Sequence, residues 1–306
     1  MPNLNLITFF GDYGLEQQLE HNIIEFIKYG LLEIGALYNL NTTMPESKLS
    51  PVFHSSTGIA VNYKVWNGIK HDWIWESGIS LNFPSGAQPT AISGLSYNGT
   101  FYATGTAISG TGYYIDYSRG RVVFNNPVPS GSNVRLNYSI RAVQVYPSDS
   151  YEARTLTHDW WKKAQGSGIY STKETMYLPA VLVDINSYKT IRGIELGSRG
   201  KTVEASVQFD ILAANSEECD KITDLIYMME TKAFNLMNIN QTGFIWPLNV
   251  SGVLSNNAQT WPYMSNNFSM GIARFMENAN VRKMSKSLLP VLHSRVIMGL
   301  EVDVNP

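Results

Sequence analysis

Two short motifs place a histidine beside an aspartate, the pairing in this sequence that most suggests a metal site. His-Asp-Trp occurs at 71–73 and again at 158–160. Histidine and aspartate both ligate metal ions, but neighbouring residues of a strand point to opposite faces. No paired-cysteine or HxxxH motif follows either copy to complete a ligand set. We therefore expect surface or packing roles for these residues, and we predict no metal and no cofactor.

A glycine-rich segment and a single cysteine are the other candidates for catalysis. Residues 193–200 read GIELGSRG, which lacks the spacing and the Lys-Ser/Thr pair of a phosphate loop, so we interpret them as a hairpin turn. Cys219 is the only cysteine. It falls in the first turn of a predicted helix, where a thiolate is favoured, but no histidine in its sequence context matches it. The Asp and Glu residues show no glycosidase pattern. The sequence thus predicts a protein that is not an enzyme.

Tryptophan is the remaining residue type that could bind a ligand. Trp66, Trp73 and Trp75 cluster in a region rich in strand-forming residues. Exposed tryptophans on a sheet can stack on sugar rings, but tryptophan is also used in cores and in subunit interfaces. Two interpretations stay open at this point: packing in a core or interface, and a surface that binds carbohydrate.

The composition is that of a globular chain with little charge. Of its 306 residues, 44% are hydrophobic and 16% are charged, and the formal net charge is −2. This charge offers no basic field to nucleic acid, and no run of about 18 apolar residues is present to span a membrane. Weak charge also means weak repulsion between copies, which suits a protein that packs against itself.

The first predicted element is a helix from Leu15 to about Leu40. Its apolar residues recur at steps of three and four and form one stripe: Leu15, Leu19, Ile23, Phe26, Ile27, Leu31 and Ile34. The stripe packs either on its own chain or on a neighbouring subunit, so its residues up to Leu31 are candidates for a subunit interface. The loop near 246–264 is a second candidate, through Trp246, Trp261 and Tyr263.

A β-rich domain is expected at 50–147, after a linker-like segment at 41–45. Its clearest part is 112–146, which reads as three strands joined by two tight turns, with Gly120 supplying positive φ in the first turn. The alternation of apolar and polar residues is strict up to Arg141 and then changes phase. A bulge or an exchange of packing partners would explain this change. Short strands separated by turns are typical of a β-sandwich.

The last region, 148–306, combines strands with one strongly marked helix. Strands are predicted near 178–185, 203–211 and 295–303, and an extended segment at 267–285. Asn215 or Ser216 can cap a helix whose first turns are acidic. The predicted fold class is therefore α+β and multi-domain: an N-terminal helical segment at 1–49, a β-sandwich-like domain at 50–147, and at 148–306 an α+β domain with a mostly antiparallel sheet and a helix on one face.

Two stretches of the chain resemble virion proteins of tailed bacteriophages. The stretch YYIDYSRGRVVFNNPVPSGSNVRLNYSIR is similar to strand–turn–strand segments of such proteins. The stretch LPAVLVDI, followed by ELGSRGKTVEASVQFDILAANSEECDKITDLI, resembles phage neck and tail-completion proteins. In those proteins a strand, a hairpin, a long strand and an acidic-capped helix follow in that order. The resemblance covers roughly residues 112–230.

The resemblance implies a structural protein that forms a homo-oligomeric ring at the head–tail neck or in the upper tail, as a tail terminator or connector does. Its partners would be copies of itself and other neck or tail proteins. It would be assembled in the host cytoplasm and reside in the virion, and it carries no catalytic residues to transfer. The alternative is a receptor- or carbohydrate-binding virion module in a fibre, collar or baseplate, in which Trp66, Trp73 and Trp75 stack on the ligand.

Overall fold

The computed structural model describes the chain as a sheet-dominated α+β protein, with two helices and several antiparallel sheets in its described residues. This confirms the coarse fold class expected from the sequence. The described residues are 14–44, 64–68, 70–76, 88–129, 131–150, 153, 178–193, 201–249, 251–255, 269–276, 280–284 and 292–304.

The chain divides into two compact units, each containing segments that are distant in sequence. The first unit comprises Met1–Gly30, Val143–Phe244 and Thr260–Pro306, and the second comprises Leu31–Ala142 and Ile245–Gln259. The division expected from composition, at 49/50 and 147/148, stays a prediction. The chain passes between units at Ala142 and Val143, so an exchange of packing partners accounts for the change of phase seen there in the sequence.

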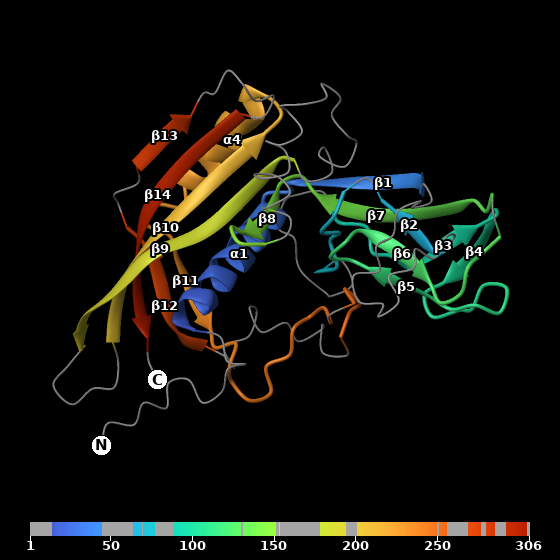
Figure 1. Cartoon of the computed structure of the whole chain (residues 1–306), viewed down its shortest axis with the longest axis horizontal. Coiled ribbons are helices and arrows are strands. Elements are labelled where there is room, and N and C mark those ends of the chain that lie inside the picture. The colour runs from blue at the N-terminus through green and yellow to red at the C-terminus, as the bar shows by residue number, and fades with distance from the viewer. Residues whose placement is uncertain are drawn as a thin grey trace. The chain divides into compact units, whose positions relative to one another are not determined.

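The first unit is built on a seven-stranded sheet (Figure 1). The strand order is β11-β12-β14-β10-β9-β8. The seventh strand, β13, pairs with residues 293–297 of β14, whereas β12 pairs with residues 300–304 of the same strand. All pairs are antiparallel except β8 with β9. The strands are β8 (Gln144–Pro147), β9 (Ala180–Gly193), β10 (Lys201–Ala213), β11 (Ala233–Met237), β12 (Ser269–Phe275), β13 (Asn280–Met284) and β14 (Leu292–Val304).

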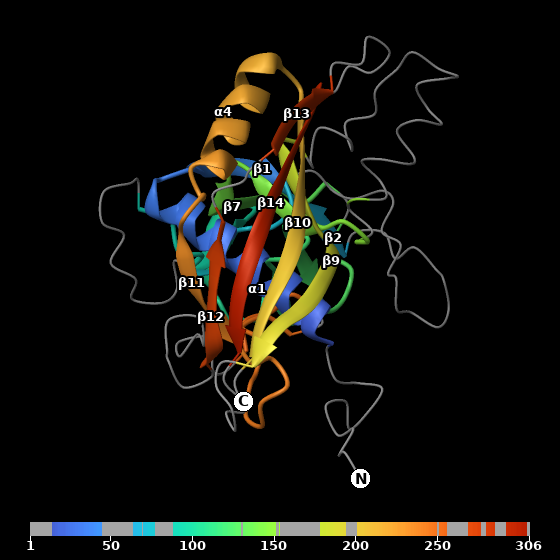
Figure 2. The same ribbon diagram turned by 90° about the vertical axis from the view of Figure 1, so that its left-hand side faces the viewer.

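Alternation along the two central strands gives this sheet a buried face and a polar face. The buried residues are Val203, Ala205, Val207, Phe209 and Ile211 on β10, and Val296, Met298, Leu300 and Val302 on β14. Both helices lie on the buried face, α1 (Leu15–Glu33) and α4 (Ser216–Tyr227) (Figures 1 and 2). The predicted cap of α4 is confirmed, because the side chain of Asn215 accepts a hydrogen bond from the N–H of Glu218 at 2.8 Å.

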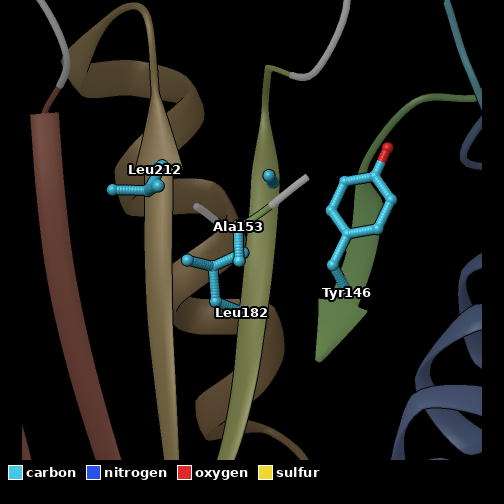
Figure 3. Packing of buried hydrophobic residues seen from close by; sticks show 5 residues of the cluster. Tyr146, Ala153, Leu182 and Leu212 are labelled. Carbon is cyan, nitrogen blue, oxygen red and sulfur yellow. The ribbon is translucent and has the colours of Figure 1, made fainter. Parts of the chain in front are cut away.

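A smaller apolar cluster lies on the other face of the sheet, opposite the helices, at the end where β8 and β9 begin. It consists of Tyr146, Ala153, Ala180, Leu182 and Leu212, all buried (Figure 3). Leu182 is the register partner of Asp210, so the two residues share a face. The polar face therefore begins at Asp210 and continues along β10 away from this cluster.

Two buried amides fix helix α1 to the edge strand β11. The side chain of Asn22 donates to the carbonyl oxygen of Met237 at 3.1 Å and accepts from its N–H at 2.7 Å. Gln18 accepts from the N–H of Ile239 at 3.2 Å. An edge strand has unpaired backbone groups, and here they are satisfied by side chains of a helix more than 200 residues earlier in the chain. Phe26 stacks on Phe234 of the same strand, with ring centroids 4.7 Å apart.

The N-terminal helix is shorter than the sequence predicts. It ends at Glu33, and residues up to Leu40 that we expected to be helical belong instead to β1 (Leu37–Met44). Gly35, with φ of 74°, ends the helix: its N–H bonds to Leu32 and that of Ala36 bonds to Leu31. These two bonds form a Schellman motif, which requires a residue of positive φ at this place.

The second unit contains two small antiparallel sheets. The four-stranded sheet has the order β1-β7-β3-β4, and the three-stranded sheet has the order β2-β6-β5. Gly120, with φ of 60°, lies in the turn between β5 and β6, as predicted. The remaining strands are β2 (Val65–Asn67), β3 (Gly94–Tyr97), β4 (Thr100–Ala103), β5 (Tyr113–Asp116), β6 (Arg121–Phe124) and β7 (Val134–Arg141).

We predict that Asn22→Ala destabilises the first unit by about 3 kcal/mol, because it leaves two backbone groups of Met237 buried without a partner. Urea unfolding followed by circular dichroism measures the change. Glu33→Ala, at an exposed position at the end of the same helix, serves as the control and should change stability by less than about 0.5 kcal/mol. An Asn22→Ala protein as stable as the wild type would show that these hydrogen bonds do not hold α1 in place.

Candidate functional site

The apolar stripe of α1 is buried within the chain. Leu19 and Ile23 have no exposed surface, and Ile27 and Leu31 are also buried. Leu15 and Phe26 are half-buried. Side chains without exposed surface cannot contact a neighbouring subunit, so of the two interpretations of this stripe the structure supports packing on its own chain. The prediction that Leu19, Ile23, Ile27 and Leu31 form a subunit interface is therefore wrong, and for Leu15 and Phe26 it stays a prediction.

The second candidate interface lies mostly beyond the described residues. Trp246 is half-buried in the second unit. Trp261 and Tyr263 lie outside the described residues, and so does the second His-Asp-Trp motif.

The tryptophan cluster lies in the core of the second unit and not on its surface. Trp66, Trp73 and Trp75 are all buried. The indole of Trp73 stacks on Tyr138 with ring centroids 4.1 Å apart, and its N–H donates to the carbonyl of Lys70 at 2.9 Å. Its ring fills the space next to Gly120, where a Cβ would lie 2.7 Å from the indole nitrogen. These rings present no face to a sugar, so the carbohydrate-stacking interpretation of them is wrong.

A buried arginine explains the first His-Asp-Trp motif. Arg141, at the end of β7, is 1% exposed and forms ion pairs with Asp72 at 3.3 Å and with Glu76. Asp72 therefore has a packing role, as expected from the sequence. His71 beside it has its pKa lowered to about 4, first by burial and then by the positive charge of Arg121. The imidazole of His71 is therefore neutral at pH 7.

A second buried carboxylate organises the turn between β5 and β6. Asp116 has no exposed side-chain surface and forms ion pairs with Arg121 at 2.8 Å and Arg119 at 3.2 Å. It also accepts from the hydroxyl of Ser118. Gly252 lies directly against it, because a Cβ there would be 2.0 Å from the carboxylate, and the carbonyl of Gly252 accepts from Tyr117. The segment around 252 thus packs on this turn.

A charged cluster lies at the start of the polar face of the first unit. Asp210 accepts hydrogen bonds from His293 at 2.7 Å and from Arg295 at 2.7 and 3.2 Å. Burial alone would raise the pKa of Asp210, but the hydrogen bonds and charges of His293 and Arg295 outweigh it and hold the pKa below its usual value. Sequence analysis missed this cluster. Asp210 and Arg295 occupy polar positions in predicted strands and His293 lies just before the second of them, but only the register of β10 against β14 shows that the three meet.

Glu20 of helix α1 lies close enough to Asp149 and Asp184 for their charges to change its pKa. The pKa of Glu20 is raised to about 7, first by burial and then by the charges of Asp149 and Asp184. Among the described residues, no group of three or more His, Cys, Asp or Glu side chains is arranged to hold a metal ion. Cys219 is buried in α4.

The four-stranded sheet of the second unit carries the clearest candidate interaction surface. Its two end strands, β1 and β4, are largely exposed. Large apolar side chains are exposed on or beside them, namely Ile34 at 57%, Tyr38 at 56% and Phe101 at 60%. Exposed apolar residues at an unprotected sheet edge favour contact with another polypeptide.

Comparisons with protein-family models and with curated proteins found no match to this sequence. The class of protein that the fold itself defines is a sheet-dominated α+β protein with two compact units. No helix in the described ranges is long and apolar enough to cross a membrane.

We predict that Asp210→Asn lowers stability at pH 7 by about 2 kcal/mol, because it removes the charge that His293 and Arg295 surround. Since the pKa of Asp210 lies below its usual 3.8 in the folded chain, its contribution is present above about pH 4 and is lost as the pH falls through the folded value. Urea unfolding at a series of pH values should show the largest difference between wild type and variant at pH 7, and the difference should shrink as the pH is lowered below about 4. Glu217→Gln, in an exposed ion pair of α4, should cause no measurable change at either pH. A difference between wild type and variant that stays the same at every pH below 4 would contradict the assignment.

We predict the opposite pH dependence for Glu20. Its folded pKa of about 7 exceeds its usual 4.5, so the folded state binds more protons between these values and wild-type stability falls as the pH rises through them. Glu20→Gln removes this loss and should be more stable than the wild type at pH 8, by about 1 kcal/mol after allowance for solvent screening. Glu16→Gln, one turn earlier and exposed, is the matched control. Equal pH profiles for wild type and Glu20→Gln would exclude a raised pKa.

Proposed function

We propose that this chain is a structural component of a tailed-phage virion, which assembles as a ring at the head–tail neck or in the upper tail. It acts by binding copies of itself and neighbouring virion proteins, and it catalyses no reaction. Its site of action is the virion, after assembly in the host cytoplasm.

The observation that carries this proposal is the succession β9, β10 and α4. The structure pairs β9 with β10 as an antiparallel hairpin, and α4, with Glu217 and Glu218 in its first turn, packs against β10 and β14. This is the order of elements that the resemblance to neck and tail-completion proteins implies. The second of the two resembling stretches is therefore the sequence that builds the central part of the first unit.

Two further observations favour assembly as the mechanism. The chain carries a net charge of only −2, so copies repel one another weakly. The second unit exposes two sheet edges, and large apolar side chains lie beside them. Heterologous contacts between different surfaces of identical subunits generate a ring when the rotation closes.

The finer architecture belongs to the same proposal. The two small sheets of the second unit would form a β-sandwich-like module, and the first unit would be the tail-completion-like body. The alternative function, a receptor- or carbohydrate-binding module, depended on Trp66, Trp73 and Trp75, and their burial removes its support.

The burial of the α1 stripe also changes the test of assembly. A double substitution Leu19→Asp with Ile23→Asp would have separated subunits if α1 were the interface. Because both side chains are fully buried, it should now unfold the first unit. Assembly must therefore be measured on the intact chain.

We predict that the purified wild-type protein forms discrete closed rings. Light scattering over a concentration series should give one mass that is an integer multiple of 34.2 kDa, and negative-stain images of that peak should show rings. Denaturing the sample and repeating the measurement in urea gives the monomer mass as a control. A monomer at every concentration would contradict self-assembly into a ring.

A further inference from the structure

In the described residues, the two end strands of the four-stranded sheet carry few of the usual protections of edge strands. β1, LYNLNTTM, is eight residues long and pairs with β7 without a register shift. β4, TFYA, is the strand at the other end. Native edges are commonly protected by lysine, proline or a bulge, and neither strand has a charged residue or a proline. Both edges are therefore suited to pairing with another strand.

The hydrogen-bond pattern shows which backbone groups of β1 point away from the sheet. The carbonyl of Ala36 accepts from the N–H of Ala142 at 2.9 Å, which starts the ladder between β1 and β7. Bonded and non-bonded pairs alternate in an antiparallel ladder, so the even-numbered residues of β1 bond to β7. The odd-numbered residues, among them Asn41 and Thr43, direct their N–H and C=O groups outward. In the described part of the chain, no strand pairs with this edge.

The backbone groups of β4 that point away from the sheet follow from its ladder with β3. The N–H of Thr104 donates to Ser93 at 2.9 Å and continues the ladder between β3 and β4. By alternation Tyr102 bonds inward and Phe101 directs its backbone groups outward. The side chain of Phe101 is also 60% exposed. β4 therefore offers the backbone groups of Phe101 together with its apolar side chain, whereas the carbonyl of Ala103, the other outward residue, accepts from the N–H of Thr106 at 3.0 Å.

The number of strands decides how two such sheets can join. All three pairings in the order β1-β7-β3-β4 are antiparallel, so β1 and β4 run in opposite directions. If a second copy is placed by rotation about an axis along the strands, its β4 runs antiparallel to β1 of the first copy. The sheet then continues from one copy to the next with every neighbouring pair antiparallel. With an odd number of strands, the two end strands would run in the same direction and the junction between copies would be parallel.

We infer that copies of this chain pair edge to edge, with β4 of one subunit bonded to β1 of the next. This inference rests on the proposed function, because it names the contact by which the ring closes. The competing arrangement, β1 against β1 across a two-fold axis, stops at a dimer and leaves both β4 edges open. Pairing β1 with β4 gives each end strand a partner in a closed ring, and the four residues of β4 then cover half of the eight residues of β1.

The test blocks each edge separately. Thr43→Pro and Phe101→Pro each remove an outward N–H, a position at which an edge strand tolerates proline. Each variant should lower the affinity between subunits by at least about tenfold. Thr43→Val and Phe101→Tyr keep the N–H group and should assemble like the wild type. If circular dichroism shows that a proline variant is unfolded, Thr43→Lys or Phe101→Lys replaces it, because an edge lysine opposes pairing without changing the backbone.

Mixing the two variants distinguishes the arrangements. The Thr43→Pro subunit keeps a normal β4 and the Phe101→Pro subunit keeps a normal β1. An equal mixture should form a one-to-one dimer and nothing larger, whereas each variant alone stays monomeric. Assembly of Phe101→Pro alone would overturn the inference in favour of β1 against β1.

The outcomes for the wild type separate this inference from the proposed function. If the wild type forms rings and both proline variants form the same rings, the edge pairing is wrong, whereas the proposed ring is still supported. Open filaments that both substitutions abolish would support the edge pairing and contradict the closed ring. A wild type that is monomeric at every concentration would overturn both.

Discussion

The pairing of β10 with β14 is the constraint on which the first unit depends. It joins thirteen residue pairs without a register shift, from Lys201 with Val304 to Ala213 with Leu292. Because strand side chains alternate between faces, this one register places Phe209 and Met298 on the buried face. It also brings Asp210 to Arg295 on the polar face. A slip of one residue would exchange the two faces, leaving α1 and α4 with no apolar surface to cover.

The second unit relies on a different kind of interaction. Its sheets have only three and four strands, and buried ion pairs connect them to the loops. Arg141 holds the segment that contains Asp72 and Glu76, and Asp116 holds its own turn, against which Gly252 packs. Removing one member of such a pair leaves a buried charge without a partner, so these contacts fix a single arrangement of the loops.

Local signals in the sequence predicted the elements well, and long-range contacts decided what could not be predicted. The alternation along 203–211 predicted β10, the cap at Asn215 with the acidic first turn predicted α4, and Gly120 predicted its turn. The end of α1 was misjudged because Gly35 was read as a weak helix residue, whereas its positive φ ends the helix. Trp73 could be assigned to core or surface only from its packing on Tyr138. The cluster around Asp210 depends on a register between strands more than 80 residues apart, which no local pattern reports.

The central claim is that this chain is a subunit that completes its four-stranded sheet with a copy of itself. Cryo-electron microscopy of the purified assembly tests this claim most directly, because it shows the ring and the contact together. We expect a closed ring in which the outer edge of β1 lies one strand spacing, about 4.8 Å, from β4 of the next subunit. A ring whose subunits meet through other surfaces, with β1 and β4 facing solvent, would contradict it.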